Sequence, residues 1–160
     1  MIETLPKVAH EHHDVILRHI NALEAIADGI STAPTDELAE RIATEYHFIT
    51  DQLIPHMNQA EATIYPQLER LMQNRHSMTP MRREHEFLRK LISELAEVDI
   101  RGASFGARFR LRRVIYRMVA LIKTHLAEEE AYIDVLRGNL SPAEAEELAR
   151  GLRHATTDPS

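Results

Sequence analysis

Apolar residues recur along most of the chain at intervals of three and four positions, and the strict alternation of a half-buried strand is absent. Intervals of three and four place apolar side chains on one face of a helix. The pattern predicts four long helices and a short fifth one, at residues 5–29, 36–72, 79–98, 105–137 and 141–154. Long helices joined by short loops are typical of an all-α fold, here an up-down-up-down antiparallel four-helix bundle with a short C-terminal fifth helix. Ligand sites in such bundles lie in the core, between facing helices.

Helix starts and an internal proline add detail to this pattern. Thr79 and Pro80 are expected to cap and begin the third helix, and S-P-A-E at 141–144 has the form of a capping box with proline at the first helical position. The second helix contains Pro55, which has no backbone N–H to donate. We therefore expect a kink in this helix just before His56.

Length and composition limit the class of protein. The 160 residues fit one domain, 1–160, with a bundle core at about 5–137 and an accessory helix at about 141–154. A net charge of −6 argues against a dedicated nucleic-acid binder, which ordinarily carries a basic stripe. The absence of cysteine excludes disulfides, thiolate metal ligands and cysteine nucleophiles. No apolar run reaches the roughly 18 residues of a membrane span, and polar residues interrupt the N-terminal segment where a secretory leader would be apolar. We therefore expect a cytoplasmic protein without membrane partners.

The chain holds ten histidines, an unusual number, and four of them share a face with apolar residues, one on each long helix. They are His13, His56, His85 and His125. One core histidine is ordinarily a hydrogen-bonded structural residue, but one on every helix is hard to explain by independent packing. An unpaired polar group in a core costs about 1–3 kcal/mol, and a metal site would satisfy all four imidazoles at once. Counted from the helix ends, the four fall in one layer of an antiparallel bundle, toward the loop that follows residue 72.

Two glutamates accompany these histidines. Glu129 follows His125 by four residues, which places both on one helix face. Glu61 follows His56 by five residues, about 140° around an ideal helix, although the apolar face there is wide enough to include both. In the alternative reading, the two carboxylates lie at the rim of the core beside arginines. Four histidines and two carboxylates without sulfur suit iron, manganese or zinc, and six ligands shared by two ions leave an open position.

Four segments resemble the hemerythrin-like, or HHE cation-binding, family, in the family's order and over roughly residues 5–137. They are HHDVILRHINALE (12–24), HMNQAEATIYP (56–66), MRREHEFLRKL (81–91) and HLAEEEAYIDVL (125–136). The most specific parts are H…E…YP, then EH on the next helix, then HxxxE on the last. The resemblance implies a four-helix bundle with a non-haem di-iron centre that reacts with dioxygen, hydrogen peroxide or nitric oxide.

The resemblance also carries over a set of metal ligands, namely His13, His56, Glu61, His85, His125 and Glu129. The chain departs from the family at two positions. Ala60 stands where the family usually has a glutamate four residues after the second-helix histidine, so Glu61 would have to substitute for it. Arg89 stands where oxygen-carrying members have a second histidine on the third helix.

These departures leave one iron with fewer ligands than in the oxygen carriers, unless His12, His76 or Tyr65 contributes. His12 is also a rival to His13 as the ligand from the first helix. An incomplete ligand set favours an open, reactive or sensing centre over plain oxygen storage.

We therefore expect two non-haem iron ions, oxo- or hydroxo-bridged, with manganese or zinc as alternatives. The expected partner is a small diatomic or peroxide ligand; as an enzyme, the protein would be a di-iron oxidoreductase that decomposes peroxide as a catalase does. A ferritin-like carboxylate enzyme is disfavoured because no histidine has a glutamate three residues before it. A passive metal-binding protein and a non-catalytic helical interaction protein stay open as alternatives, and the chain is expected to be a monomer or a homodimer.

Overall fold

Helices make up most of the chain in the computed structural model, which describes residues 4–102 and 106–154. The α-helices are α1 (Leu5–Gly29), α2 (Thr35–Phe48), α3 (Ile54–Gln59), α4 (Tyr65–Leu71), α5 (Thr79–Glu97), α6 (Ala107–Arg137) and α7 (Pro142–His154). No strand occurs among the described residues, so the predicted all-α class is confirmed. The predicted start of the fourth helix at residue 105 lies outside the described residues. None of the described helices combines the length and the apolar character needed to cross a membrane.

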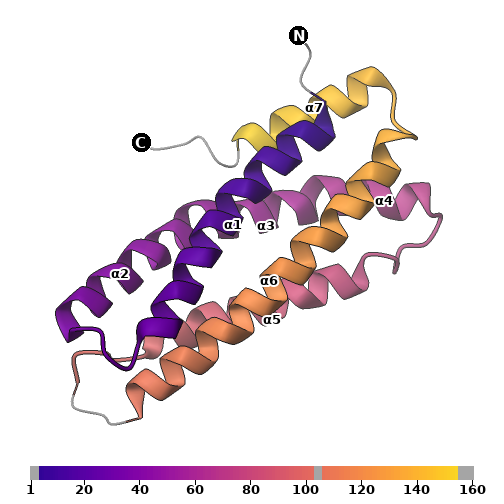
Figure 1. Cartoon of the computed structure of the whole chain (residues 1–160). Coiled ribbons are helices and arrows are strands. Elements are labelled where there is room, and N and C mark those ends of the chain that lie inside the picture. The colour runs from indigo at the N-terminus through magenta and orange to yellow at the C-terminus, as the bar shows by residue number, and fades with distance from the viewer. Residues whose placement is uncertain (1–3, 103–105, 155–160) are drawn as a thin grey trace.

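The chain from residue 35 to residue 71 is one unbroken helical run, in which two wider π turns separate α2, α3 and α4 (Figure 1). The π turns are η1 (Ile49–Leu53) and η2 (Ala60–Ile64), and each ends two residues before a proline, Pro55 or Pro66. Proline donates no backbone hydrogen bond and its ring crowds the carbonyl four residues earlier. A π turn relieves this crowding because it pairs residues five apart. The disturbance expected at Pro55 takes the form of a π turn, and the second one, before Pro66, is a further feature that the spacing of apolar residues does not predict.

The second π turn brings three side chains onto one face of this helical run. The Tyr65 N–H donates to the Ala60 carbonyl, five residues back, so Tyr65 lies one turn beyond Ala60. Ala60 in turn lies one α-helical turn beyond His56. In an uninterrupted α-helix the nine residues from His56 to Tyr65 would turn about 180°, and Tyr65 would point away from the side that His56 faces. Because of the π turn, all three side chains are buried.

The long helices pack lengthwise against one another. α6 packs along both α1 and α5, and α1 also packs on α2 (Figure 1). The loop at residues 30–34 and the C-terminal end of α5 lie at one end of the molecule, and the loop at residues 72–78 lies at the other. α7 runs back along α1 and contacts α3 and η2. α7 therefore covers the part of the molecule where the second π turn lies.

The apolar core is divided into two clusters along the length of the helices. On α1, one cluster ends at Ala9 and the other begins at Ile16. On α6, one ends at Leu126 and the other begins at Ile133, and α5 shows a similar gap. The histidines that the sequence places on the apolar faces fall in or beside these gaps. A polar layer therefore lies between two apolar cores.

The starts of two helices test the capping motifs read from the sequence. The Ser141 N–H donates to Oε2 of Glu144 at 2.9 Å, and the Glu144 N–H donates to the Ser141 hydroxyl at 3.3 Å. The capping box predicted at the start of α7 is therefore confirmed. In contrast, α5 begins at Thr79 itself and Met78 is its N-cap, so the prediction that Thr79 caps this helix is wrong by one residue. The reason is local, because the Met78 carbonyl accepts the first helical hydrogen bond, from the Arg82 N–H at 3.0 Å.

Two arginines of α6 hold the C-terminal end of α1. Arg108 Nη1 donates to the carbonyls of Ile30 at 2.5 Å and Ala33 at 2.8 Å, and Arg112 Nε donates to the carbonyl of Ala27 at 3.3 Å. The last carbonyls of a helix lack intrahelical donors, and a positive charge there also interacts favourably with the helix dipole. These contacts fix α1 against α6 at the end of the molecule away from the polar layer.

Replacing Arg108 with methionine should destabilise the fold. We expect Arg108→Met to lower the free energy of unfolding by about 1–2 kcal/mol, because two carbonyls lose a charged donor. Chemical denaturation compares this variant with Arg110→Met, which changes an exposed arginine of the same helix. Equal stability of the two variants would show that the contacts of Arg108 contribute nothing.

Candidate metal centre

The polar layer contains five of the six residues that the sequence predicts as metal ligands, and each is at most 3% exposed. α1 supplies His13, α3 supplies His56, α5 supplies His85, and α6 supplies His125 and Glu129. Each of the four histidines is thus contributed by a different helix. This convergence depends on the apolar periodicity of each helix, which places one polar residue at the same level of the molecule.

Glu129 is the centre of this layer. Its Oε1 lies 3.1 Å from Nε2 of His13 and 3.1 Å from Nε2 of His56. Its Oε2 lies 3.4 Å from Nε2 of His125 and accepts a hydrogen bond from the Tyr65 hydroxyl at 2.9 Å. The two oxygens of one carboxylate therefore face two different sets of donors.

Two groups of possible metal ligands share this carboxylate. They are His13, His56 and Glu129, and His85, His125 and Glu129. Within each group the ligand atoms lie within 4.8 Å of one another. That spread fits the surroundings of a single ion, whose bonds to nitrogen and oxygen are about 2.0–2.2 Å long. A carboxylate common to both groups has the form of a bridging ligand between two ions.

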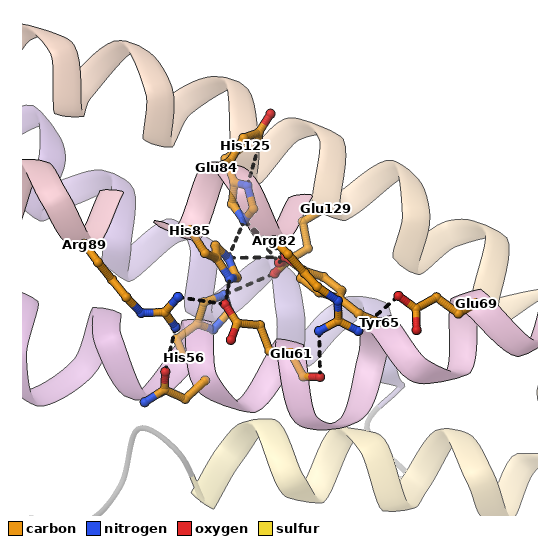
Figure 2. Close-up of polar contacts among 11 residues, drawn as sticks. His56, Glu61, Tyr65, Glu69, Arg82, Glu84, His85, Arg89, His125 and Glu129 are labelled. Carbon is orange, nitrogen blue, oxygen red and sulfur yellow. Dashed lines mark hydrogen bonds and ion pairs between the residues drawn. The ribbon is translucent and has the colours of Figure 1, made fainter. Parts of the chain in front are cut away.

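Tyr65 completes the second group. Its hydroxyl oxygen lies 3.3 Å from Nε2 of His85 and 3.4 Å from Nε2 of His125, and these two nitrogens are only 2.9 Å apart (Figure 2). Burial and the neighbouring His125 lower the pKa of His85 to about 4, so its imidazole is neutral at pH 7. Burial and the charge of Glu129 raise the pKa of Tyr65, so the phenol keeps its proton unless a cation is bound. A bound cation would be close to two imidazole nitrogens, a phenol oxygen and a carboxylate oxygen.

The buried carboxylate and imidazoles shift one another's pKa values. Burial alone would lower the pKa of His13 and His125, but hydrogen bonds to Glu129, supported by Glu130 and Glu84 respectively, raise it. Burial alone would raise the pKa of Glu129, but hydrogen bonds from His125 and His13 hold it well below its ordinary value. A carboxylate held ionised in the core needs positive charge beside it. A metal cation would supply that charge and displace protons from the imidazoles.

Three further carboxylates fix the orientation of the imidazoles from outside. Each accepts a hydrogen bond from the Nδ1 of one histidine: Glu130 from His13 at 3.1 Å, Glu61 from His85 at 2.7 Å and Glu84 from His125 at 2.6 Å. A proton held on Nδ1 leaves the lone pair of Nε2 free for a metal, as in metal sites where a carboxylate supports a ligating histidine. His56 differs, because its Nδ1 is buried and has no hydrogen-bond partner among the residues that the structure describes.

Glu61, the sixth predicted ligand, lies on the outer side of His85 (Figure 2). Its Oε1 accepts hydrogen bonds from His85 Nδ1 at 2.7 Å and from Arg89 Nη1 at 3.0 Å, and its side chain is 27% exposed. Ala60, one helical turn after His56, is the residue that faces the core at this position. Glu61 is absent from the two ligand groups found among the described residues. Its role as a direct ligand stays a prediction, and the contacts favour a role in orienting His85.

The three further residues that the sequence offers as possible ligands, Tyr65, His12 and His76, lie in different surroundings. Tyr65 lies inside the layer. His12 is half-buried, and its ring lies edge-on to that of His56 with 6.3 Å between the ring centroids. His76 is exposed in the loop after α4 and accepts a hydrogen bond from Arg75. Of these three, only Tyr65 reaches the ligand groups.

Sequence reasoning missed Glu84 and Glu130. Each acts on a histidine of another helix, 41 or 117 residues away in the sequence. No spacing within one helix marks such a pair, because the contact depends on how two helices lie against each other. The only available clue was that both carboxylates directly neighbour predicted ligands, His85 and Glu129.

Glu129→Gln should abolish metal binding in both ligand groups. Glutamine keeps the size of the side chain but loses the charge and one ligating oxygen. Loss of a residue that only supports a ligand lowers metal affinity by about 10–100-fold, so we expect a fall of more than about 100-fold here. Elemental analysis after dialysis measures the effect. Glu128→Gln, at an exposed neighbouring position, is the control. Full metal content in Glu129→Gln would exclude this carboxylate as the shared ligand.

Glu61→Gln separates the two possible roles of Glu61. As a support for His85, its amide oxygen can still accept the Nδ1 hydrogen bond, so the metal content should stay unchanged while affinity falls about 10–100-fold. As a direct ligand, its loss should lower the metal content. Competition with a chelator measures affinity and stoichiometry together, with Glu86→Gln at an exposed position of α5 as the control.

Comparison with known proteins agrees with this geometry. A family model described as the hemerythrin HHE cation binding domain matches residues 4–133, which include every residue of both ligand groups. Comparisons with curated proteins and with solved structures found no significant match. The family match covers most of the chain and the helices that carry the polar layer. The chain therefore belongs to the hemerythrin HHE cation-binding domain family.

Proposed function

We propose that this chain is a single-domain di-iron protein that binds or transforms dioxygen, hydrogen peroxide or nitric oxide at an open iron position. In this proposal residues 1–160 form one domain, an up-down-up-down antiparallel bundle closed by the C-terminal helix. The observation that carries the proposal is the shared carboxylate, because the two oxygens of Glu129 face two separate histidine pairs inside the buried polar layer. The family's cation-binding character supports it.

The donor atoms suit iron. Nitrogen and oxygen donors without sulfur are compatible with iron, manganese and zinc, and the phenol of Tyr65 favours ferric iron, for which a phenolate is a good ligand. The two positions are unequal. One would be held by His85, His125, Tyr65 and the shared carboxylate, whereas His13 and His56 stand alone beside the other oxygen of that carboxylate. The poorer position leaves more room for a small ligand.

The residues of the chain would prepare the centre in three ways. The outer carboxylates keep the Nδ1 protons in place, so that each Nε2 can point at a metal. Glu129 balances the charge of both ions. The two apolar clusters keep bulk water away from the layer, which strengthens every electrostatic interaction inside it. The iron itself would supply the redox change and the binding of the small molecule.

Ala60 and Tyr65 distinguish this centre from the usual pattern of the family. Ala60 stands where the family pattern has a glutamate, and its buried methyl group offers no ligand atom. The π turn then brings the Tyr65 hydroxyl into the layer from the next turn of the helix. We infer that a phenol oxygen replaces a carboxylate oxygen in the ligand set. Turnover of hydrogen peroxide is the enzymatic form of this proposal.

Metal content and absorption of one sample test the proposal. Protein purified in air should contain about two iron ions per chain, with ligand-to-metal absorption in the near-ultraviolet and visible range that changes when peroxide is added. The visible part should disappear in Tyr65→Phe while iron content stays above half of the original, because the phenolate produces that absorption. Tyr132→Phe, a partly buried tyrosine on α6, is the control.

Two results would contradict the proposal. A folded protein with zinc or no metal and a featureless spectrum would favour a passive metal-binding or interaction protein. Iron with an absorption spectrum unchanged by Tyr65→Phe would keep the di-iron centre but remove Tyr65 from the ligand set.

A further inference from the structure

The metal ligands are buried, so a small molecule needs a route to them. His13, His85 and Glu129 have no exposed surface, and His56 and His125 are only 2% and 3% exposed. A cavity of about 180 Å³ lies between α1 and η1 and is lined by His12, Val15, Ile16 and Gln52. It is smaller than the roughly 300–1,000 Å³ that enclose drug-sized ligands, so its size suits molecules of a few atoms.

Two residues that line this cavity lie one helical turn from predicted metal ligands. Ile16 lies one helical turn after His13 on α1, and Gln52, inside the π turn η1, lies one turn before His56. His12, the neighbour of His13, has its ring edge-on to His56 with 6.3 Å between the centroids. The cavity therefore lies alongside the His13 and His56 pair, with the His12 ring at the boundary.

Another groove also approaches the polar layer, but a hydrogen-bonded carboxylate separates it from the ligand atoms. It lies between α1 and α6, and its lining includes Lys7, His10, Glu130 and Asp134. Glu130 accepts hydrogen bonds from both His10 and His13, and it reaches His13 at Nδ1, the nitrogen that faces away from the shared carboxylate. A molecule in this groove would have to break that hydrogen-bonded contact. By contrast, the walls of the cavity at η1 are the apolar side chains of Val15 and Ile16, the uncharged amide of Gln52 and the ring of His12, and its lining includes no Asp, Glu, Lys or Arg.

We propose that neutral molecules of two or three non-hydrogen atoms, such as dioxygen, nitric oxide or hydrogen peroxide, reach the centre through the cavity at η1, past the His12 ring. The proposal rests on the proposed function and adds a route and a selectivity to it. The apolar walls at Val15 and Ile16 disfavour ions, which lose their hydration on passage. Val15 and Gln52, on opposite walls, set the width of the route.

Nitric oxide binding to the reduced, iron-loaded protein provides the kinetic test. Val15→Phe fills the cavity without touching a predicted ligand, so association and dissociation rates should both fall by about tenfold or more while the dissociation constant stays unchanged. Equal slowing of both rates identifies a narrowed route, because a changed binding site would alter the equilibrium. Val98→Phe is the matched control, since Val98 is also half-buried and lines two other cavities.

A second variant tests the same route in case Val15→Phe does not fold. Gln52→Phe fills the same cavity from the opposite wall and should slow both rates as Val15→Phe does, with iron content equal to that of the wild type. Wild-type rates in a folded Val15→Phe or Gln52→Phe variant with full iron content would overturn the route. A changed dissociation constant with unchanged rates of association would overturn it as well.

A measurement without iron separates this proposal from the function on which it rests. Dissolved dioxygen is paramagnetic and broadens the NMR signals of methyl groups that it approaches. In the metal-free protein, the methyl groups of Val15 and Ile16 should be broadened more than those of the fully buried Leu111, and Val15→Phe should remove the effect at Ile16. Uniform broadening would overturn the route whatever metal the protein binds, whereas absence of iron with selective broadening would overturn only the proposed function.

Discussion

The burial of the Glu129 carboxylate is the constraint on which the rest of this structure depends. The side chain has no exposed surface, and an isolated ionised carboxylate in a core is among the most expensive groups that a protein can bury. Four imidazoles and one phenol surround it, and three outer carboxylates hold three of those imidazoles in place. The helices α1, α3, α5 and α6 each contribute a histidine at this one level, and apolar residues occupy the levels on either side. The fold is thus organised around one negative charge that needs cationic neighbours.

The π turn before Pro66 connects the backbone to the chemistry of this layer. It pairs Tyr65 with Ala60 instead of with the residue four positions back. This one-residue change in register turns Tyr65 into the core. Glu61 lies at the edge, where it accepts hydrogen bonds from His85 and Arg89. Ala60 and Tyr65, which the hydrogen bond of the π turn joins, are both fully buried. Pro66 follows two residues after this π turn, which relieves the crowding between the proline ring and the preceding turn of the helix.

The helical periodicity was sufficient to predict the all-α class, the four buried histidines and Glu129, because each of these depends on a single helix and its apolar face. It was insufficient for Tyr65, since a regular 3.6-residue turn places this residue on the side opposite His56. For Glu61, about 140° around the helix from His56, periodicity alone did not decide between a ligand and a position at the edge. Glu84 and Glu130 could not be identified either. Their partners lie on other helices, so their roles depend on the relative rotation of packed helices, which no one-dimensional spacing contains.

The division of the apolar core has a consequence for cooperativity. Most small bundles transmit stability from end to end through one continuous set of apolar contacts. Here two separate clusters meet across a layer of hydrogen-bonded polar groups. The hydrogen bonds of the imidazoles and Glu129 therefore help to couple the two halves of the molecule, together with the helices that run through both. A cation bound there would join the halves directly and would stabilise the folded chain by an amount that increases with its occupancy of the layer.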